Sequence, residues 1–158
     1  MKKVIVIGLI IILTIIVLYG TYSLFLKRTP EKVLKQVFNI CLNGFDYSIE
    51  SFKEQWHPNG DGKLLLIIKF NELSQENITY LKGLDNSKPL PISETEYWQM
   101  HPNEIPKQVL SSETGYYVFR TGRISNHELK KGIKMALDFY IFIIDTEKKM
   151  AVLYYSFM

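Results

Sequence analysis

The residue types that most often carry chemistry are sparse in this chain and poorly spaced for joint action. None of the three histidines, His57, His101 and His127, lies at metal-ligand spacing from Cys41 or from another histidine, and no HExxH pattern occurs. Metal sites need three or four converging ligands. His57 and His101 each precede a proline, which favours surface turns over a ligand role.

Cys41 is the only cysteine, so the chain forms no internal disulfide. It falls on an apolar helical stripe, where a small buried side chain is the ordinary outcome. A catalytic thiol would need a nearby histidine to lower its pKa. We therefore expect Cys41 to be a packing residue.

The densest acidic group is Asp46, Glu50 and Glu54. On a strand, Asp46 and Glu50 would share a face about 13 Å apart, which is too far for a glycosidase carboxylate pair. The run 59–62 (NGDG) lacks the alternating oxygen ligands and final glutamate of a calcium loop and favours a turn. We assign no catalytic, metal-binding or cofactor-binding residue, and we expect no cofactor.

The chain begins with 23 uncharged, mostly apolar residues, 4–26, flanked by Lys2, Lys3, Lys27 and Arg28. As a helix this stretch would extend about 35 Å, enough to cross the hydrocarbon core of a bilayer. Tyr19 and Tyr22 lie near its far end, as aromatic residues do at a membrane interface. We predict a transmembrane helix that binds the lipid bilayer through residues 4–26.

A cleaved signal peptide, with Thr21 and Ser23 before the cut, is the main alternative, but its apolar core is usually only about 7–15 residues long. A buried core helix would have a polar face, and a lipoprotein would have a cysteine near the end of the run. The basic residues after the helix favour a cytoplasmic domain. The short basic N-terminus resembles an uncleaved export signal, and on that ground we expect the domain outside the cytoplasm.

Residues 29–158 are numerous enough for one domain with a modest core. The segment through Arg28 holds four basic and no acidic side chains, which leaves 15 basic and 16 acidic side chains in the remainder. A domain with a net charge of −1 lacks the excess positive charge that is typical of nucleic-acid-binding domains. We expect two parts, an anchor over 1–28 and a single soluble domain over 29–158.

The first half of the domain reads as helix, strand, strand, helix. Thr29 and Pro30 predict a helix start, and Asn43-Gly44 its end. Alternation over 45–57 predicts a strand whose phase flips near Ser51, as at a bulge, although a helix could also place Ile49, Phe52 and Trp56 on one face. A turn at 58–62 joins it to a central strand over 63–70. Ser74 would cap a helix from about 75 to 83.

The second half reads as loop, strand and hairpin. Two prolines suggest that 85–102 crosses the surface as a long excursion with Tyr97 and Trp98 held down. Residues 105–110 could form a short helix or turn, 115–120 a strand, and 126–134 one or two helical turns. Two β-rich runs, 136–145 and 150–158, predict a hairpin whose first strand is covered on both sides and whose second has a wetter face.

Together these elements predict an α+β fold: an N-terminal transmembrane helix, then a small, mostly antiparallel five-stranded sheet with one or two packed helices. The sheet would carry many aromatic rings, since the chain has ten Tyr and nine Phe. Tyr116-Tyr117 and Tyr154-Tyr155 each put one ring on either face. Such rings fill a core, or form an exposed strip that binds a partner protein.

The sequence thus indicates a single-pass membrane protein that we expect not to be an enzyme. The leading function is non-catalytic binding of another protein through an aromatic sheet surface on the extracytoplasmic side, as in an accessory subunit or an immunity factor. One alternative is an envelope-acting enzyme with a site assembled by folding, marked by a cleft that holds His57 or His101 beside Cys41 or an acidic residue. The other is a purely structural tether.

Overall fold

A computed structural model describes residues 11–17, 29–58, 61–100, 105, 107–130 and 133–157 of the chain. Within these ranges, no helix combines the length and the apolarity needed to cross a membrane. Residues 11–17 are helical, and the rest of the transmembrane stretch predicted over 4–26 lies outside the described residues.

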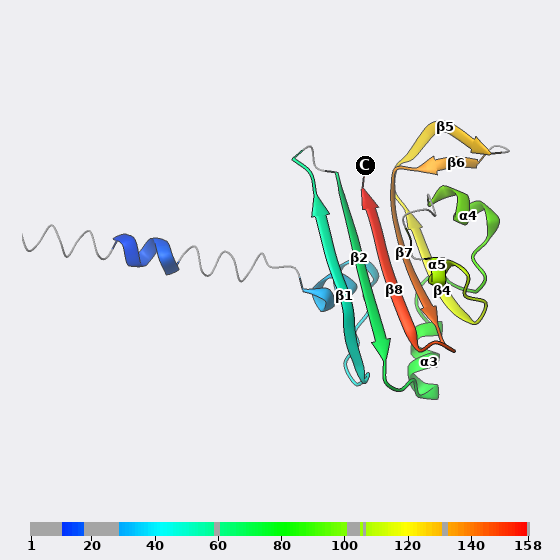
Figure 1. The fold of residues 1–158 in the computed structure, drawn as a ribbon, viewed down its shortest axis with the longest axis horizontal. Helices are drawn as coiled ribbons and strands as arrows, with labels where there is room; N and C mark the ends of the chain where they lie inside the picture. Colours follow the sequence, from blue (N-terminus) through cyan, green and yellow to red (C-terminus); the bar gives the residue numbers. More distant parts are fainter. Residues whose placement is uncertain are drawn as a thin grey trace, which may run out of the picture.

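An antiparallel sheet of six strands organises the domain (Figure 1). Its order is β1-β2-β8-β7-β4-β3, and every neighbouring pair is antiparallel. The strands are β1 (Tyr47–Trp56), β2 (Gly62–Phe70), β3 (Ser87–Pro89), β4 (Gly115–Thr121), β7 (Asp138–Asp145) and β8 (Met150–Phe157). Two further strands, β5 (Ile124–Lys130) and β6 (Ile133–Ala136), pair with each other as a separate ribbon.

Four short helices accompany the sheet: α2 (Pro30–Phe38), α3 (Gln75–Lys82), α4 (Glu94–Gln99) and α5 (Lys107–Leu110). Thr29, Ser74 and Ser93 cap the first three, each accepting a hydrogen bond from a backbone N–H of the first turn. The α+β class and the antiparallel sheet predicted from the sequence are therefore confirmed.

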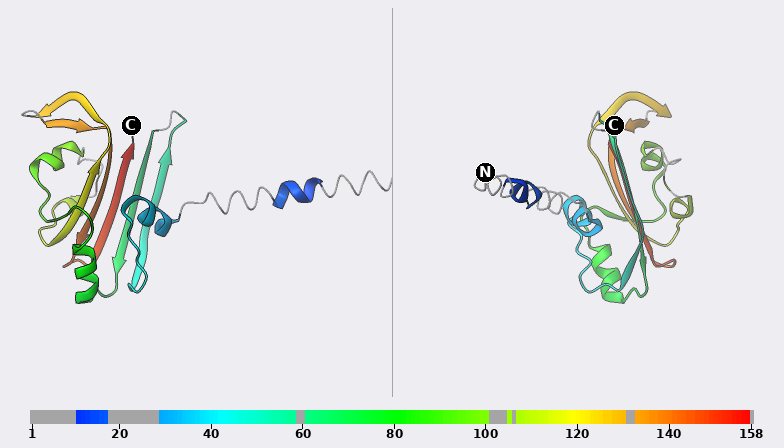
Figure 2. Two further views of the ribbon diagram at one scale, coloured as in Figure 1. Left: turned by 180° about the vertical axis from the view of Figure 1, so that it is seen from behind. Right: turned by 60° about the vertical axis from the view of Figure 1, so that its left-hand side comes forward.

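The helices lie on opposite faces of the sheet (Figure 2, right). We call the face under α2 and α3 the α2 face; its core holds Leu66, Phe142 and Leu153. We call the other the α4 face; its core holds Ile141, Val152 and Tyr154. Alternate residues of the central strands thus point into two cores, and β7 is buried almost throughout, as expected.

The hairpin of β1 and β2 forms with the predicted bulge. Ile49 pairs with Ile68 and Ser51 with Ile67, so Glu50 is the extra residue. The bulge turns Phe52 and Trp56 onto the same face as Tyr47. Their respective partners on β2, which are Leu66, Gly62 and Phe70, are separated by even numbers of residues and therefore share one face. The helical alternative for this segment is wrong.

Five strands were expected, and the sheet has six because β3 adds to β4 at the edge. The long surface excursion predicted over 85–102 contains β3 and α4, neither of which was predicted. The helical turns predicted over 126–134 are wrong as well, since these residues fall largely in β5 and β6. The secondary structure of these polar segments depends on which strands they pair with. Their hydrophobic pattern indicates little about that pairing.

Two smaller predictions fail for reasons of packing. The first helix ends at Phe38, with Asn39 in the left-handed conformation (φ 58°), and so stops short of Asn43-Gly44. The face of β8 that was expected to be wetter is buried, because Tyr154 and Ser156 are 3% and 1% exposed on the α4 face, whereas Tyr155 and Phe157 on the α2 face are half-buried. The cover on this face comes from segments whose packing was not predicted.

Candidate interaction surface

Four aromatic side chains gather on the α2 face at the end of the sheet where β8 finishes, marked C in Figure 1. They come from β1 and from the hairpin of β7 and β8, and we call them the aromatic platform: Trp56, Tyr140, Tyr155 and Phe157. Trp56 is 42% exposed, and the other three rings are half-buried. The platform therefore presents aromatic surface to solvent.

The centre of the aromatic platform is a stacked pair. Tyr140 of β7 and Tyr155 of β8 are directly opposite in the strand register. Their ring centroids are 4.5 Å apart and the ring planes differ by only 7°. Such a cross-strand contact contributes about 0.5–1.5 kcal/mol beyond the burial of its area. Each ring fixes the other, so the pair is ordered before any partner arrives.

Trp56 extends the aromatic platform across β2. Its indole lies on Gly62, its direct partner in the register. A Cβ added to Gly62 would come within 2.2 Å of a Trp56 ring carbon, so only glycine leaves room for this packing. The indole reaches Tyr155 at a centroid distance of 6.0 Å.

An arginine borders the other side of the aromatic platform. The Arg123 guanidinium lies 4.9 Å from the ring centroid of Phe157, a cation–π distance. The same guanidinium donates two hydrogen bonds to the Asp138 carboxylate, at 2.6 and 2.9 Å. Asp138 is opposite Phe157 in the register and is only 6% exposed. This pairing holds the arginine against the ring.

The C-terminal end of α2 closes a third side. Phe38 meets Tyr140 edge-on at a centroid distance of 6.4 Å. Arg120 lies 5.5 Å over the Phe38 ring and donates a hydrogen bond from Nη1 to the Val37 carbonyl oxygen at 3.0 Å. The aromatic platform is thus a ring cluster with two arginines at its margins, the composition that dominates protein-binding hot spots.

A buried polar cluster lies elsewhere, beneath α4. Glu96 accepts hydrogen bonds from Lys88 Nζ at 2.6 Å, Ser93 Oγ at 2.7 Å and Tyr117 Oη at 2.5 Å. Burial raises the pKa of Glu96, but these three donors outweigh it and leave the pKa below its usual value. Burial and the bond to Glu96 raise the pKa of Tyr117. These bonds join β3, α4 and β4, so the cluster has a structural role.

A second buried carboxylate closes the turn between β7 and β8. Asp145, 2% exposed, accepts bonds from Ser112 Oγ at 2.6 Å and from the Lys148 backbone N–H at 2.7 Å. The Lys148 ammonium lies 3.1 Å away. Burial alone would raise the pKa of Asp145, yet these partners lower it. This site fixes the hairpin.

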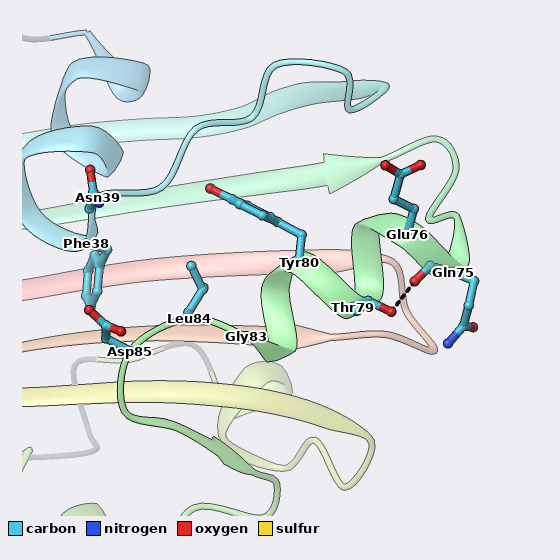
Figure 3. Close-up of a pocket in the computed structure, with 9 residues that line it drawn as sticks. All are labelled: Phe38, Asn39, Gln75, Glu76, Thr79, Tyr80, Gly83, Leu84 and Asp85. Carbon is cyan, nitrogen blue, oxygen red and sulfur yellow. Dashed lines mark hydrogen bonds between the residues drawn. The ribbon is translucent and has the colours of Figure 1, made fainter.

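An open groove of about 760 Å³ runs between the end of α2 and helix α3 (Figure 3). Its carboxylates, Glu76 and Asp85, appear at opposite ends of the groove in Figure 3. The lining residues, all described, are Phe38, Asn39, Gln75, Glu76, Thr79, Tyr80, Gly83, Leu84 and Asp85. They include no histidine, cysteine, lysine or arginine.

Cys41 is exposed and does not pack in a core, contrary to expectation. The reason is the early end of α2 at Phe38, which leaves Cys41 in the following loop. It lines a cavity of about 240 Å³ beside Glu31 and Tyr47. The lining residues of that cavity, all within the described part of the chain, include no histidine.

The histidines stay apart from this thiol where they can be placed. His57 is exposed at the end of β1, where its backbone N–H bonds to the Asp61 carbonyl oxygen. His101 lies outside the described residues, and His127 is in β5. Across the described ranges, no group of three or more His, Cys, Asp or Glu side chains could hold a metal ion. Asp46, Glu50 and Glu54 are all exposed.

The predicted aromatic residues divide between the two faces. Tyr117 and Tyr154 are buried in the α4-face core, at 2% and 3% exposed. Of the four tyrosines singled out in the sequence, only Tyr155 joins the aromatic platform. Sequence reasoning missed Tyr140, Phe157 and the cluster around Glu96. The pattern Ser93-x-x-Glu96 is a capping box that could have revealed α4.

No protein-family model matches this chain, and no curated protein or solved structure shows significant similarity to it. Its function therefore has to be inferred from its own residues.

Proposed function

We propose that this protein is a single-pass membrane-anchored, non-catalytic module that binds another protein through its aromatic platform. The observation that carries this proposal is the accessible ring cluster at the end of the sheet, with Trp56 42% exposed beside the stacked Tyr140 and Tyr155. Large exposed aromatic clusters bordered by arginine are typical of protein interfaces.

Preorganisation supports a binding role. Ordering a flexible side chain at an interface costs about 0.5–1.5 kcal/mol. The rings of the aromatic platform are already fixed by one another, by Gly62 and by the Arg123–Asp138 pair. A partner would therefore bind these rings without that entropic cost.

Anchoring rests on the apolar stretch 4–26. Its described part, residues 11–17, is helical, and its large apolar side chains are 54–65% exposed. Lipid would remove this surface from water. We propose that the domain lies on the extracytoplasmic face, as an accessory or immunity-like factor would.

Anchoring is tested by washing membranes from the native cell with alkaline carbonate. We expect the intact chain, starting at its first residues, in the membrane pellet. A reporter fused after Met158 should be active only outside the cytoplasm. Protein that starts near Leu24 and washes free would overturn the anchor, and a reporter active inside would overturn the orientation.

Binding is tested by co-purifying partners of the detergent-solubilised full chain. We expect Tyr155→Ala to reduce a specific partner by about tenfold or more, the size of a hot-spot loss. Tyr80→Ala is the matched control, because Tyr80 is 40% exposed on α3 and contacts Phe45, outside the aromatic platform. Equal retention by both variants and the parent would overturn the proposal.

A further inference from the structure

The two edges of the six-stranded sheet differ sharply. Strand β3 at one edge has three residues and ends in Pro89, a short form that resists further strand addition. Strand β1 at the other edge has ten residues, most of them exposed. A long edge strand presents backbone donors and acceptors to another strand.

The sequence of β1 is complementary to itself when two copies run antiparallel. When Phe52 of one copy is opposite Phe52 of the other, the strands match over their full length, because the bulge residues Glu50 and Ser51 of each copy together face Lys53 of the other. Glu50 then lies opposite Lys53, and Tyr47 opposite Trp56, each twice by symmetry. Opposite charges and aromatic pairs are both favourable cross-strand contacts.

The bulge makes this register possible. Directly opposed residues of an antiparallel pair share a face, and in a regular strand positions 47 and 56 would lie on opposite faces. Because Glu50 is an extra residue, Tyr47 and Trp56 both lie on the α2 face, opposite Phe70 and Gly62. Glu50 and Lys53 point to the α4 face, as shown by the 3.7 Å contact of Glu50 with Lys69 and the pairing of Lys53 with Leu65.

The position of α2 fits two copies in one membrane. Its first turn lies beside the start of β1, where Tyr47 Oη donates a hydrogen bond to Glu31 at 3.3 Å. A two-fold axis perpendicular to the paired sheets keeps both α2 helices on one face, next to the axis. Only residues 27–29 separate the proposed anchor from α2, a reach of about 10 Å. Both anchors could therefore enter the same bilayer.

From this geometry we infer that the protein is a homodimer joined through antiparallel pairing of its β1 edges, in the register that places Glu50 opposite Lys53. The occupant of the edge is a second copy of this chain. The pairing does not depend on the aromatic platform; it depends on the proposed anchor only in that the anchors hold both copies in one bilayer. Backbone bonds would provide the affinity and the charge pairs the register.

Disulfide trapping tests this register in the native membrane. Cys41→Ser removes the native thiol, and Glu50→Cys and Lys53→Cys are then placed on separate, differently tagged full-length chains. Under mild oxidation we expect a covalent dimer that contains both tags. Each single variant expressed alone should give at least tenfold less dimer, because its two thiols would be about three residues out of register, beyond disulfide reach.

A charge exchange provides the second measurement, on chains without added cysteine. Glu50→Lys and Lys53→Glu each place like charges opposite one another twice, and we expect each to weaken dimerisation about tenfold or more. The double exchange should restore it, although Lys69 still faces an unfavourable charge at position 50. Glu113→Lys, on an exposed residue remote from β1, should have no effect.

The outcomes separate this inference from the proposed function. A covalent dimer that needs both cysteines, with recovery in the double exchange, supports β1 pairing whether or not a partner protein is found. The inference is overturned if no covalent dimer with both tags forms, or if a single cysteine variant gives as much covalent dimer as the mixture. It is also overturned if neither single charge exchange weakens dimerisation. Loss of partner binding in Tyr155→Ala bears only on the aromatic platform.

Discussion

The Trp56 indole lies directly on Gly62, so closely that a single added methyl group at Gly62 would come within 2.2 Å of the ring. This contact joins the edge strand β1 to its neighbour and sets the exposed end of the aromatic platform. Gly62 is the first residue of β2. Here it makes room for the residue most available to a partner.

Gly62→Ala should therefore displace the indole. We expect a loss of about 1–3 kcal/mol in the free energy of unfolding, as for other overpacked sites. Tryptophan fluorescence in a Trp98→Phe background should shift as Trp56 leaves the sheet, and urea denaturation gives the stability. Gly83→Ala is the control, since a Cβ there meets nothing closer than 3.4 Å. Equal effects of the two substitutions would contradict this packing.

The stacked tyrosines should contribute jointly to stability. Because Tyr140 and Tyr155 are 4.5 Å apart and nearly parallel, a double-mutant cycle with Leu at both positions should give a coupling of about 0.5–1.5 kcal/mol. Chemical denaturation of the four chains measures it. Additive single losses would show that the rings are not stacked in solution.

The buried carboxylates predict a loss of stability in acid. Glu96 and Asp145 have lowered pKa values in the folded chain. Their contribution is fully present above the unfolded values and is lost as the pH falls through the folded ones. The free energy of unfolding should therefore decline below about pH 4.5. Glu96→Gln should be less stable at pH 7 and show a shallower decline.

That comparison requires urea denaturation at several pH values between 7 and about 3. Glu76→Gln is the matched control, since it makes the same substitution at an exposed residue of α3. If the unfolding free energy of Glu96→Gln declined with pH in parallel with that of the parent, the donors Lys88, Ser93 and Tyr117 would not stabilise the charged form of Glu96.

The helix caps should differ in how much they contribute to the stability of the fold. Ser93 both accepts the Glu96 backbone N–H and donates to the Glu96 carboxylate at 2.7 Å. Thr29 only accepts from the Lys32 N–H, at 3.4 Å. Within the range of about 0.5–2 kcal/mol known for caps, Ser93→Ala should lie near the top and Thr29→Ala near the bottom. Thermal unfolding of both variants measures the order, and a reversed order would refute it.

Local signals predicted much of this fold. Thr29-Pro30 and Ser74 marked helix starts, the phase change near Ser51 marked a bulge, and the short segment 145–149 joined the final hairpin. These features depend on a few neighbouring residues. The strand β3 and the ribbon of β5 and β6 depend on pairing between segments, and their own sequences scarcely show it.

The sequence predicted that an aromatic surface could exist, but it did not predict which residues form the aromatic platform. The abundance of aromatic residues suggested either a filled core or an exposed strip, and Tyr155 lies half-buried in the aromatic platform. Its partners follow from two facts of register: Tyr140 is opposite Tyr155, and the Glu50 bulge brings Trp56 to the same face. The burial of Tyr117 and Tyr154 follows from the cover on the α4 face, which includes α4, in a segment that was predicted only as a long surface excursion.

Photo-crosslinking in the native cell tests the central claim most directly. A photoreactive phenylalanine analogue would replace Phe157 in the aromatic platform or, as the control, Tyr80 on α3. We predict one adduct of defined mass from position 157, distinct from twice the chain mass, and none of that mass from position 80. No adduct from position 157, or the same adducts from both positions, would contradict the claim that this surface binds another protein.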